Sequence, residues 1–294
     1  MEQDLLVRLY RRGFETVLGD KVEVREYDKF KDTESLDSVV NNSHILFLCL
    51  PTPMNEDGSC NISIIEEVVK EVVKTAKKKK CIVVKSTVPP GTTKALAEKY
   101  GENGHDFVFN PEFLMQATFI DDFINQDRVF LGWTGKDPQS LELLNGLYEE
   151  FAEKQKTPAK IFNTTSKQAE MAKYIANSFL TTKVVFFNEM FQICNAVGVD
   201  YDKVIDLVKL DKRIGTSHMK VPGPDGQMGA GGPCFPKDTN ALIAFAKAKG
   251  VDPLVLESVW AKNLMVRDVH EWERISSSES EIIKKYDRVY EWLL

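Results

Sequence analysis

The chain has 294 residues, of which 43% are hydrophobic and 28% charged, with a formal net charge of −6. This length and composition are typical of a soluble globular protein with enough residues for two domains and a sizeable core. The acidic balance argues against a general nucleic-acid binder. No apolar run reaches the roughly 18 residues that a membrane span needs.

Cysteine usage and the N-terminal stretch indicate the compartment. The stretch MEQDLLVRLYRRGF lacks the apolar core and cleavage site of a signal peptide. The five cysteines contain no Cys-x-x-Cys pair; they are Cys49, Cys60, Cys81, Cys194 and Cys234. This odd, widely spaced set predicts neither a disulfide framework nor a metal site. We therefore expect a cytoplasmic protein.

Strand and helix patterns alternate through the first half of the chain. The predicted strands are 22–27, 44–50, 81–86, 106–109, 128–132 and 159–162. The predicted helices are 63–76, 92–100 and about 138–153. Nearly continuous apolar strands alternating with helices indicate a parallel sheet that is covered on both faces. The fold class predicted for residues 1–163 is therefore α/β, with a Rossmann-like parallel sheet.

The second half of the chain is helical. A helical pattern without proline runs from Thr165 to about Val197, which corresponds to a helix about 48 Å long. Its apolar residues lie on more than one face, so it needs several packing partners, and a subunit interface would provide them. Further helices are predicted at 202–209, about 238–249 and 253–266. We expect an all-helical central domain at 164–268 and a helical tail at 269–294.

One cysteine has an unusual setting. Cys234 lies in GAGGPCFPKDT, where glycines allow the backbone to approach a ligand closely. Pro236 suits the first turn of a helix, so Cys234 would lie near a helix N-terminus, which favours the thiolate needed for nucleophilic catalysis. The alternative is a glycine-rich turn with an incidental cysteine.

Polar residues follow several of the apolar strands. Ligands of open α/β sheets bind outside the carboxyl ends of the strands. Thr87 and exposed amides near Gly91, in KSTVPPGTT, are therefore placed for polar contacts, as is Glu112 in FNPEFL. Each segment could instead be a turn with capping threonines. On the long helix, Lys173 and Asn177 share a face at i, i+4, and solvent exposure is the alternative for this pair.

Taken together, these segments resemble the UDP-glucose/GDP-mannose dehydrogenase family. GAGGPCFPKD is similar to its catalytic-cysteine loop, and CLPTP, STVPPGTT, NPEFL and AKYIANSFLTTKVVFFNE are similar to other hallmark segments in the family's order. The resemblance covers about residues 22–268. It implies that a nucleotide-sugar C6 alcohol is oxidised to the carboxylate with two NAD+ per turnover, through a cysteine thioester.

The resemblance also implies a role for each matching residue. The implied catalytic residues are Cys234, Lys173, Asn177, Glu112, Asp238 and Thr87. Cys234 is the nucleophile, and Lys173 and Asn177 stabilise oxyanions. Glu112 is the acid/base of thioester hydrolysis. Asp238 and Thr87 position water and tune the thiol. The implied NAD-binding residues are Asp28, Pro51, Thr52, Thr87 and Lys237. The implied substrate-binding residues are Phe113, Leu114, Lys173, Asn177, Arg213, Lys220 and Gly231, with Arg213 reaching the neighbouring subunit's substrate in a homodimer.

The identity of the substrate and the existence of turnover both stay open. UDP-glucose is favoured, and GDP-mannose or a UDP-N-acetylhexosamine is the alternative. A rival of another class is a protein that binds a nucleotide sugar, or serves assembly, without catalysis.

The chain departs from the family's pattern at its start. The family opens with a strand and a G-x-G-x-x-G turn, which this sequence lacks. The missing strand would lie between 22–27 and 44–50, so either upstream residues or another segment would fill that slot. We expect Asp28 to bind the adenosine ribose. Without the glycine turn, we expect NAD+ to bind in the millimolar range or not at all.

Three further departures concern the rest of the chain. The family's third domain is missing after the helices at 253–266. Gln116 stands where many members have a second glutamate. The insertion-like VPGPDGQM, residues 221–228, is predicted to be a surface hairpin.

Overall fold

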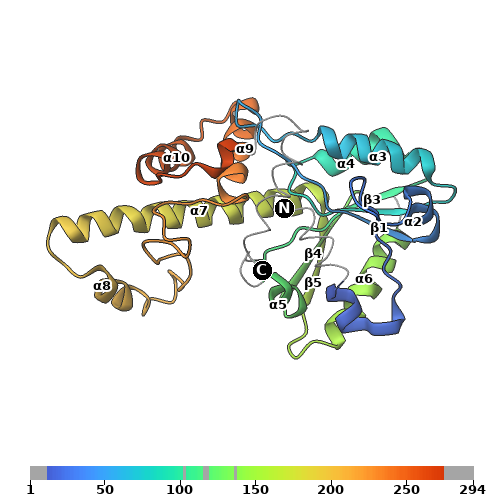
Figure 1. Ribbon diagram of the computed structural model, residues 1–294, viewed down its shortest axis with the longest axis horizontal. Helices are drawn as coiled ribbons and strands as arrows, with labels where there is room; N and C mark the ends of the chain where they lie inside the picture. The colour runs from blue at the N-terminus through green and yellow to red at the C-terminus, as the bar shows by residue number, and fades with distance from the viewer. Residues whose placement is uncertain (1–11, 102–103, 115–118, 136–137, 275–294) are drawn as a thin grey trace. The chain divides into compact units, whose positions relative to one another are not determined.

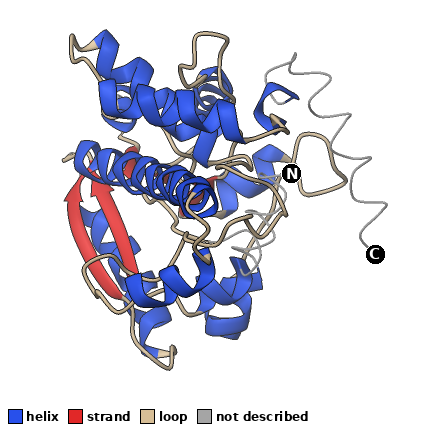
Figure 2. Cartoon of the chain, turned by 90° about the vertical axis from the view of Figure 1, so that its left-hand side faces the viewer, coloured by secondary structure: helices blue, strands red, loops and turns tan. Residues whose placement is uncertain are grey.

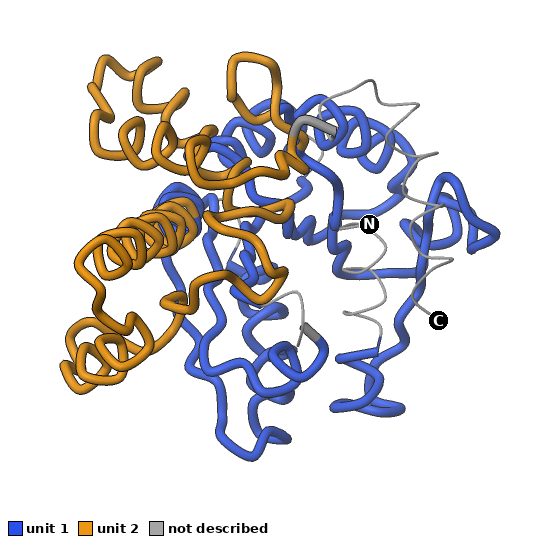
Figure 3. Tube along the Cα trace, turned by 60° about the vertical axis from the view of Figure 1, so that its left-hand side comes forward, with its two compact units in different colours: residues 1–52, 61–173 blue, residues 53–60, 174–294 orange. Residues whose placement is uncertain are grey.

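The computed structural model describes residues 12–101, 104–114, 119–135 and 138–274 (Figure 1). The chain divides into two compact units (Figure 3). The first unit comprises Met1–Thr52 and Asn61–Lys173, and the second comprises Pro53–Cys60 and Tyr174–Leu294. Gln116 and the tail residues 275–294 lie outside the described residues, so the predictions about them stay predictions.

The first unit contains a five-stranded sheet. Its strands, in spatial order, are β1 (Ile45–Leu48), β2 (Cys81–Val84), β3 (Asp106–Phe109), β4 (Arg128–Trp133) and β5 (Lys160–Thr165). All neighbouring pairs are parallel except β3 and β4. In the described residues of the connection between those two strands, the helix is the short α5 (Phe119–Ile124), whereas parallel pairing needs a full crossover. The predicted α/β fold is thus confirmed, with a mostly parallel sheet.

Two hydrophobic clusters cover the two faces of this sheet. Successive residues of β2 alternate between them, since Cys81 and Val83 belong to one cluster and Ile82 and Val84 to the other. The helices of the first unit include α2 (Leu36–Asn42), α3 (Ser63–Thr75), α4 (Thr92–Tyr100) and α6 (Pro138–Glu153). Residues 12–18 are also helical and are followed by the short η1 (Gly19–Lys21). Helices α3 and α4 pack on one face and α6 on the other (Figure 1).

The predicted strand at 22–27 is wrong. These residues have no regular secondary structure and no ladder partner, although Val22 and Val24 pack against one face cluster. Among the described residues, β1 pairs only with β2. A strand needs a neighbour with which to exchange hydrogen bonds, and no described segment lies beside the other edge of β1 to provide one.

The named elements of the second unit are helices (Figure 2). The long helix α7 (Ser166–Ala196) begins in the first unit and has 31 residues, which confirms the predicted long helix. It is followed by α8 (Tyr201–Val208), α9 (Phe235–Ala248), α10 (Leu254–Val266) and the short η3 (Glu271–Arg274). Phe187, Tyr201 and Met219 are part of a buried cluster that joins α7 and α8 to the loop after α8. Within the described part of the chain, no helix is long and apolar enough to cross a membrane.

Helix α9 starts three residues earlier than the sequence pattern suggests. Pro236 occupies its first turn, where its fixed φ favours the helix and no N–H is needed. Asp238 also lies in the first turn, where a carboxylate interacts favourably with the helix dipole.

Residues 53–60 form a turn closed by a bridge between Met54 and Cys60 and group with the second unit.

Candidate active site

Cys234 is the residue that immediately precedes α9, as the sequence predicts. Its φ and ψ are −96° and −57°, and its carbonyl accepts the N–H of Asp238 at 2.9 Å, the first turn of the helix. The residue is half-buried and is not in a disulfide. A helix N-terminus next to a partly accessible thiol is a setting that favours nucleophilic cysteine chemistry.

The other cysteines lie in different surroundings. Cys49 and Cys81 are buried, and desolvation raises the pKa of each thiol to about 12, so both stay protonated and unreactive. Cys60 and Cys194 are half-buried, and neither directly precedes a helix. Cys234 is therefore the best candidate nucleophile among them.

A buried polar network lies within the first turn of α9. Asp238 is almost fully buried, and the side-chain amide of Asn177 donates to its Oδ2 at 2.5 Å. The ammonium of Lys237 donates to Oδ1 of the same carboxylate at 2.6 Å. Both carboxylate oxygens are thus satisfied, as burial of a charge requires. The arrangement fixes the amide of Asn177, one of the predicted oxyanion donors.

In the first unit, Lys173 holds the segment that follows β3. Its ammonium donates to the backbone carbonyl of Glu112 at 2.7 Å and lies 5.2 Å from the ring centroid of Phe113. The guanidinium of Arg128 lies 4.8 Å from the same ring. Lys173 and Asn177 are both buried, so solvent exposure, the alternative for this pair, is wrong.

Beneath that segment lies a polar group that the sequence analysis missed. Lys85 is buried at the end of β2, and its ammonium donates to Oδ1 of Asn110 at 2.9 Å. The hydroxyl of Tyr148 donates to the same oxygen at 2.5 Å. Desolvation lowers the pKa of Lys85 to about 8, and the charge of Glu112 acts in the opposite direction. The only signal in the sequence was a lysine ending the apolar run CIVVK.

The two predicted strand-end loops meet at one edge of the sheet, as parallel strands require. The hydroxyl of Ser86 accepts the N–H of Leu50 at 2.9 Å and donates to the carbonyl of Leu50 at 2.6 Å. This contact joins the LPTP segment to the STVPPGTT segment. Thr52 is buried beside it, and Thr87 is half-buried.

The expectation of exposed amides near Gly91 is wrong. The backbone N–H groups of Gly91 and Thr93 donate to the two carboxylate oxygens of Glu170, the second of these at 2.8 Å. Glu170 lies on the first turns of α7 and is fully buried, so it satisfies the N-terminus of α4 in place of a ligand. Desolvation raises the pKa of Glu170, while the hydrogen bonds from these residues act in the opposite direction.

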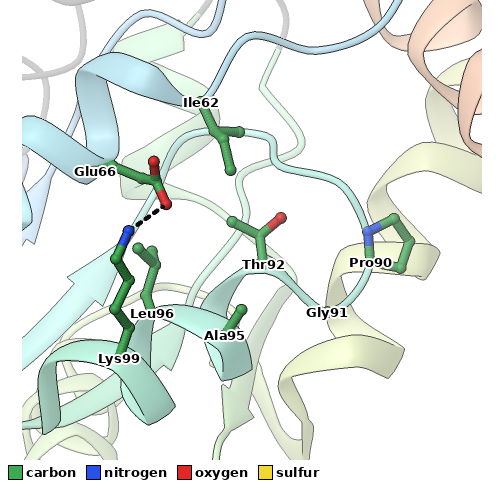
Figure 4. A pocket seen from close by; sticks show the side chains of 8 residues that line it. All are labelled: Ile62, Glu66, Pro90, Gly91, Thr92, Ala95, Leu96 and Lys99. Atoms are coloured by element: carbon green, nitrogen blue, oxygen red, sulfur yellow. Dashed lines mark hydrogen bonds and ion pairs between the residues drawn. The ribbon is translucent and has the colours of Figure 1, made fainter.

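A small cavity of about 290 Å³ lies on the outer side of the same turn (Figure 4). Its lining is Ile62, Glu66, Pro90, Gly91, Thr92, Ala95, Leu96 and Lys99. An ion pair of 3.2 Å between Lys99 and Glu66 closes one side. None of the predicted catalytic residues lines this cavity.

The remaining predicted residues have diverse settings. The carboxylate of Asp28 accepts the N–H of Phe30 at 2.9 Å and lies 3.9 Å from the ammonium of Lys31. This is the conformation of a turn aspartate, and its role toward ribose stays a prediction. Arg213 is 89% exposed and forms an ion pair with Asp211 at 2.6 Å. Lys220 is also exposed. Among the described residues, no group of three acidic, histidine or cysteine side chains is arranged to hold a metal ion.

Comparison with known proteins identifies the family of this chain. Residues 6–152 match the sequence model for the UDP-glucose/GDP-mannose dehydrogenase family, NAD binding domain, and residues 167–264 match the model for its central domain. The chain belongs to the UDP-glucose/GDP-mannose dehydrogenase family. The resemblance inferred from the five motifs is thereby confirmed, and so is NAD as the cofactor.

Relatives within this family include enzymes and solved structures. UDP-glucose 6-dehydrogenase TuaD of Bacillus subtilis is 35% identical over 256 residues, which cover 85% of this chain and 53% of the relative. UDP-glucose 6-dehydrogenase of Pseudomonas aeruginosa is 34% identical over 269 residues, 89% of this chain and 56% of the relative. The structure of a UDP-glucose dehydrogenase from Pyrobaculum islandicum matches with a TM-score of 0.69 and 32% identity, over 79% of this chain and 53% of that one.

A solved ternary complex of GDP-mannose dehydrogenase from Pseudomonas aeruginosa has a TM-score of 0.55 and 29% identity, over 79% of this chain and 53% of that one. The chain spans about half the length of the curated relatives it matches.

The described residues fit part of an NAD molecule. The loops after β1 and β2, joined through Ser86, present Thr52 and Thr87 at the carboxyl edge of the sheet, where a nucleotide binds in this class of fold. The N-terminus of α4 is not available for the pyrophosphate, because Glu170 occupies it. The residues that fit are therefore Thr52 and Thr87, two of the residues predicted to bind NAD.

Proposed function

We propose that this protein oxidises the C6 alcohol of a nucleotide sugar to the carboxylate through a thioester on Cys234, with UDP-glucose as the favoured substrate. The observation that carries the proposal is the start of α9. There, Cys234 precedes the helix, and one turn later the buried carboxylate of Asp238 fixes the amide of Asn177. A thiol, an oriented donor and a carboxylate are what acyl-enzyme chemistry requires.

The overall reaction converts one primary alcohol, one water and two NAD+ into one carboxylate, two NADH and three protons. NAD+, when bound, accepts the hydride removed in each of the two oxidations. The thiolate of Cys234 attacks the aldehyde carbon formed in the first oxidation, and the resulting hemithioacetal loses a hydride to become a thioester. Water then cleaves the carbon–sulfur bond and returns the thiol.

The proposed roles of the other residues follow from their chemistry. The amide of Asn177 and the ammonium of Lys173 donate hydrogen bonds to oxygen atoms that become negative, where a buried donor acts most strongly. The carboxylate of Glu112 accepts the proton of the attacking water. Lys173 also anchors the backbone of Glu112, so this lysine has a positioning role as well.

The same groups support catalysis over the rival, a nucleotide-sugar binding or assembly protein. A protein that only binds its ligand has no need of a thiol beside a helix N-terminus. The test is NADH formation, followed by absorbance, with UDP-glucose, GDP-mannose and UDP-N-acetylhexosamines. Acid formation with UDP-glucose supports the proposal. Tight binding of a nucleotide sugar without NADH formation would favour the rival, and preference for another sugar would correct the substrate.

We further propose that the protein is a homodimer through α7. Four apolar side chains on this helix are exposed: Ile175 (56%), Phe179 (62%), Phe186 (52%) and Ile193 (50%). Their spacings of four and seven residues place them on one face of the helix. Such a continuous apolar stripe is typical of an interface, and a second copy would present the same stripe in a symmetric dimer.

A further inference from the structure

A buried arginine lies directly behind the loop that carries Cys234. Here the cysteine loop means residues 228–234. Arg267, which directly follows α10, has a side chain only 1% exposed to solvent. Its Nη1 donates to the backbone carbonyls of Met228 and Gly229, at 3.3 and 3.4 Å. The guanidinium therefore binds the backbone at the start of the cysteine loop.

The glycines of the loop provide the space for this arginine. A Cβ added to Gly231 would overlap the guanidinium group of Arg267. A Cβ added to Gly229 would lie 2.7 Å from Oδ1 of Asn263, and that residue would also be strained at its φ of +71°. These two glycines are thus explained by the close approach of Arg267 and Asn263. The sequence analysis had attributed this freedom to the approach of a ligand.

Other side chains hold the remaining polar groups of the cysteine loop. Asn263 accepts the N–H of Ala230 at 2.7 Å and donates to its carbonyl at 3.0 Å. Oδ1 of Asn188 accepts the N–H of Gly229 at 2.9 Å. Glu271 accepts the N–H of Gly232 at 3.2 Å. The loop is therefore fixed from Met228 to Gly232 by side chains of the second unit.

Two carboxylates compensate the charge of Arg267. Its Nη2 donates to Oδ2 of Asp225 at 2.8 Å and to Oε1 of Glu271, and its Nε donates to Oε2 of Glu271 at 3.0 Å. Asp225 belongs to the insertion-like segment 221–228. That segment does turn back on itself, with the N–H of Gly223 donating to the carbonyl of Gln227 at 2.8 Å. The segment is not only a surface hairpin, because it supplies an acid to the buried arginine.

We propose that Arg267 is a positioning residue for Cys234. Held by Asp225 and Glu271, it fixes the cysteine loop and thereby keeps the thiol at the N-terminus of α9. A buried guanidinium with two carboxylates and several carbonyls has a single satisfied arrangement, since moving it would leave a buried charge unpaired. Arg267 is not proposed to contact substrate. The expected effect on turnover rests on the proposed function, whereas the expected effect on the thiol does not.

The first test measures the thiol directly. In Arg267→Met, the rate of iodoacetamide alkylation at Cys234, followed peptide by peptide with mass spectrometry at pH 7, should fall at least tenfold. The alkylation rate of Arg267→Lys should lie between those of the wild type and Arg267→Met. Lysine keeps the charge but cannot bind both carboxylates and the carbonyls in a fork. Lys262→Met is the matched control, since Lys262 is a cation on α10 that pairs with Glu189 and Gln192. It should leave the alkylation rate unchanged.

A double-mutant cycle separates positioning from a general loss of fold. Gly231→Ala alone should reduce the alkylation rate strongly, because its methyl group would overlap the guanidinium. In the Arg267→Met background the same substitution should have little additional effect, since the overlap is removed. If Arg267→Met does not fold, Asp225→Asn, at a half-exposed partner, replaces it and should reduce the rate less strongly.

The outcomes distinguish this inference from the proposed function. Alkylation of folded Arg267→Met at the wild-type rate, or additive effects in the cycle, would overturn the positioning role and leave the proposed reaction intact. A changed alkylation rate in a protein that forms no acid from any nucleotide sugar would support the positioning role and overturn the proposed reaction. In an active protein, kcat should fall in parallel with the alkylation rate, with a smaller change in KM.

Discussion

Lys85→Met should change how the stability of the protein depends on pH. In the folded protein, desolvation lowers the pKa of Lys85 from 10.5 to about 8. Between these two values the unfolded chain binds a proton that the folded chain does not, so the free energy of unfolding rises with pH. Put the other way, burying the ammonium is unfavourable below pH 8, and that penalty disappears as the lysine loses its proton.

The magnitude follows from the size of the shift. A shift of about 2.5 pKa units corresponds to about 3 kcal/mol in total, since one unit is about 1.4 kcal/mol. Most of this should appear between pH 7 and pH 10, because the lysine loses its proton over that range in the folded protein. Methionine has no proton to lose, so the difference in unfolding free energy, wild type minus Lys85→Met, should increase by that amount over this range. Subtracting the variant removes the contributions of titrating groups that do not interact with Lys85.

The assay is urea unfolding of both proteins at several pH values, followed by circular dichroism. Lys99→Met provides a control of opposite sign. A hydrogen bond with Tyr100, and then one with Glu66, raises the pKa of Lys99, so its stabilising contribution is present at lower pH and is lost only as pH rises through that raised value. The corresponding difference for Lys99 should therefore not increase between pH 7 and pH 10. A flat difference for Lys85 would mean that its ammonium is solvated and that the buried network with Asn110 is wrong.

Four further predictions concern other parts of the molecule. Cys234→Ala should fold and bind nucleotide sugar but form no acid, and acid formation at the wild-type rate would remove the thioester from the proposal. Phe186→Asp should shift the protein from dimer to monomer in light scattering, whereas Phe30→Asp, at an exposed aromatic of the first unit, should not; a wild-type protein that is monomeric at micromolar concentration would contradict the interface. The neighbouring Val185 is buried, so Val185→Asp should lower the midpoint of urea unfolding instead. Glu170→Ala should destabilise the fold by about 1–3 kcal/mol for each α4 amide left unpaired, and an unchanged unfolding midpoint would refute its capping role.

Sequence patterns predicted the helices and strands that are determined by their own local sequence. Helix α4, predicted at 92–100, has those bounds in the structure, and the apolar runs in β1 and β2 predicted buried strands. The strand at 22–27 was wrong for a different reason. Its residues suit an extended chain, but a strand also needs a partner, and no pattern inside 22–27 states whether one lies beside it. The preference of these residues for a strand was thus visible in the sequence, whereas the lack of a partner was not.

Contacts between residues that are distant in the sequence limited how much of the candidate site could be predicted. Nothing in STVPPGTT indicates that Glu170, more than 70 residues later, would occupy the amides of Gly91 and Thr93. Arg267 reads in the sequence as an ordinary charged residue at the end of a helix, because its partners Asp225 and Glu271 are identified only by the fold. Cys234 lies at the start of a helix and Lys173 and Asn177 share the long helix, as the motifs predicted, but the charged residues that hold their surroundings were not predicted.

The glycine-rich run before Cys234 shows why a motif can suggest a chemistry and still mislead about its cause. A glycine in a turn often marks a position where a Cβ cannot be accommodated or where φ is positive. Which of several neighbours excludes the Cβ is decided by the fold, and at Gly231 that neighbour is the guanidinium of Arg267. A loop whose glycines admit a ligand would be mobile until the ligand binds. A loop whose glycines admit a buried, fully paired arginine is rigid beforehand, and a rigid nucleophile avoids the reorganisation that a mobile one needs at the moment of attack. The same four letters, GAGG, therefore favour a preorganised cysteine, and the alkylation rate of Arg267→Met measures how much of its reactivity depends on that rigidity.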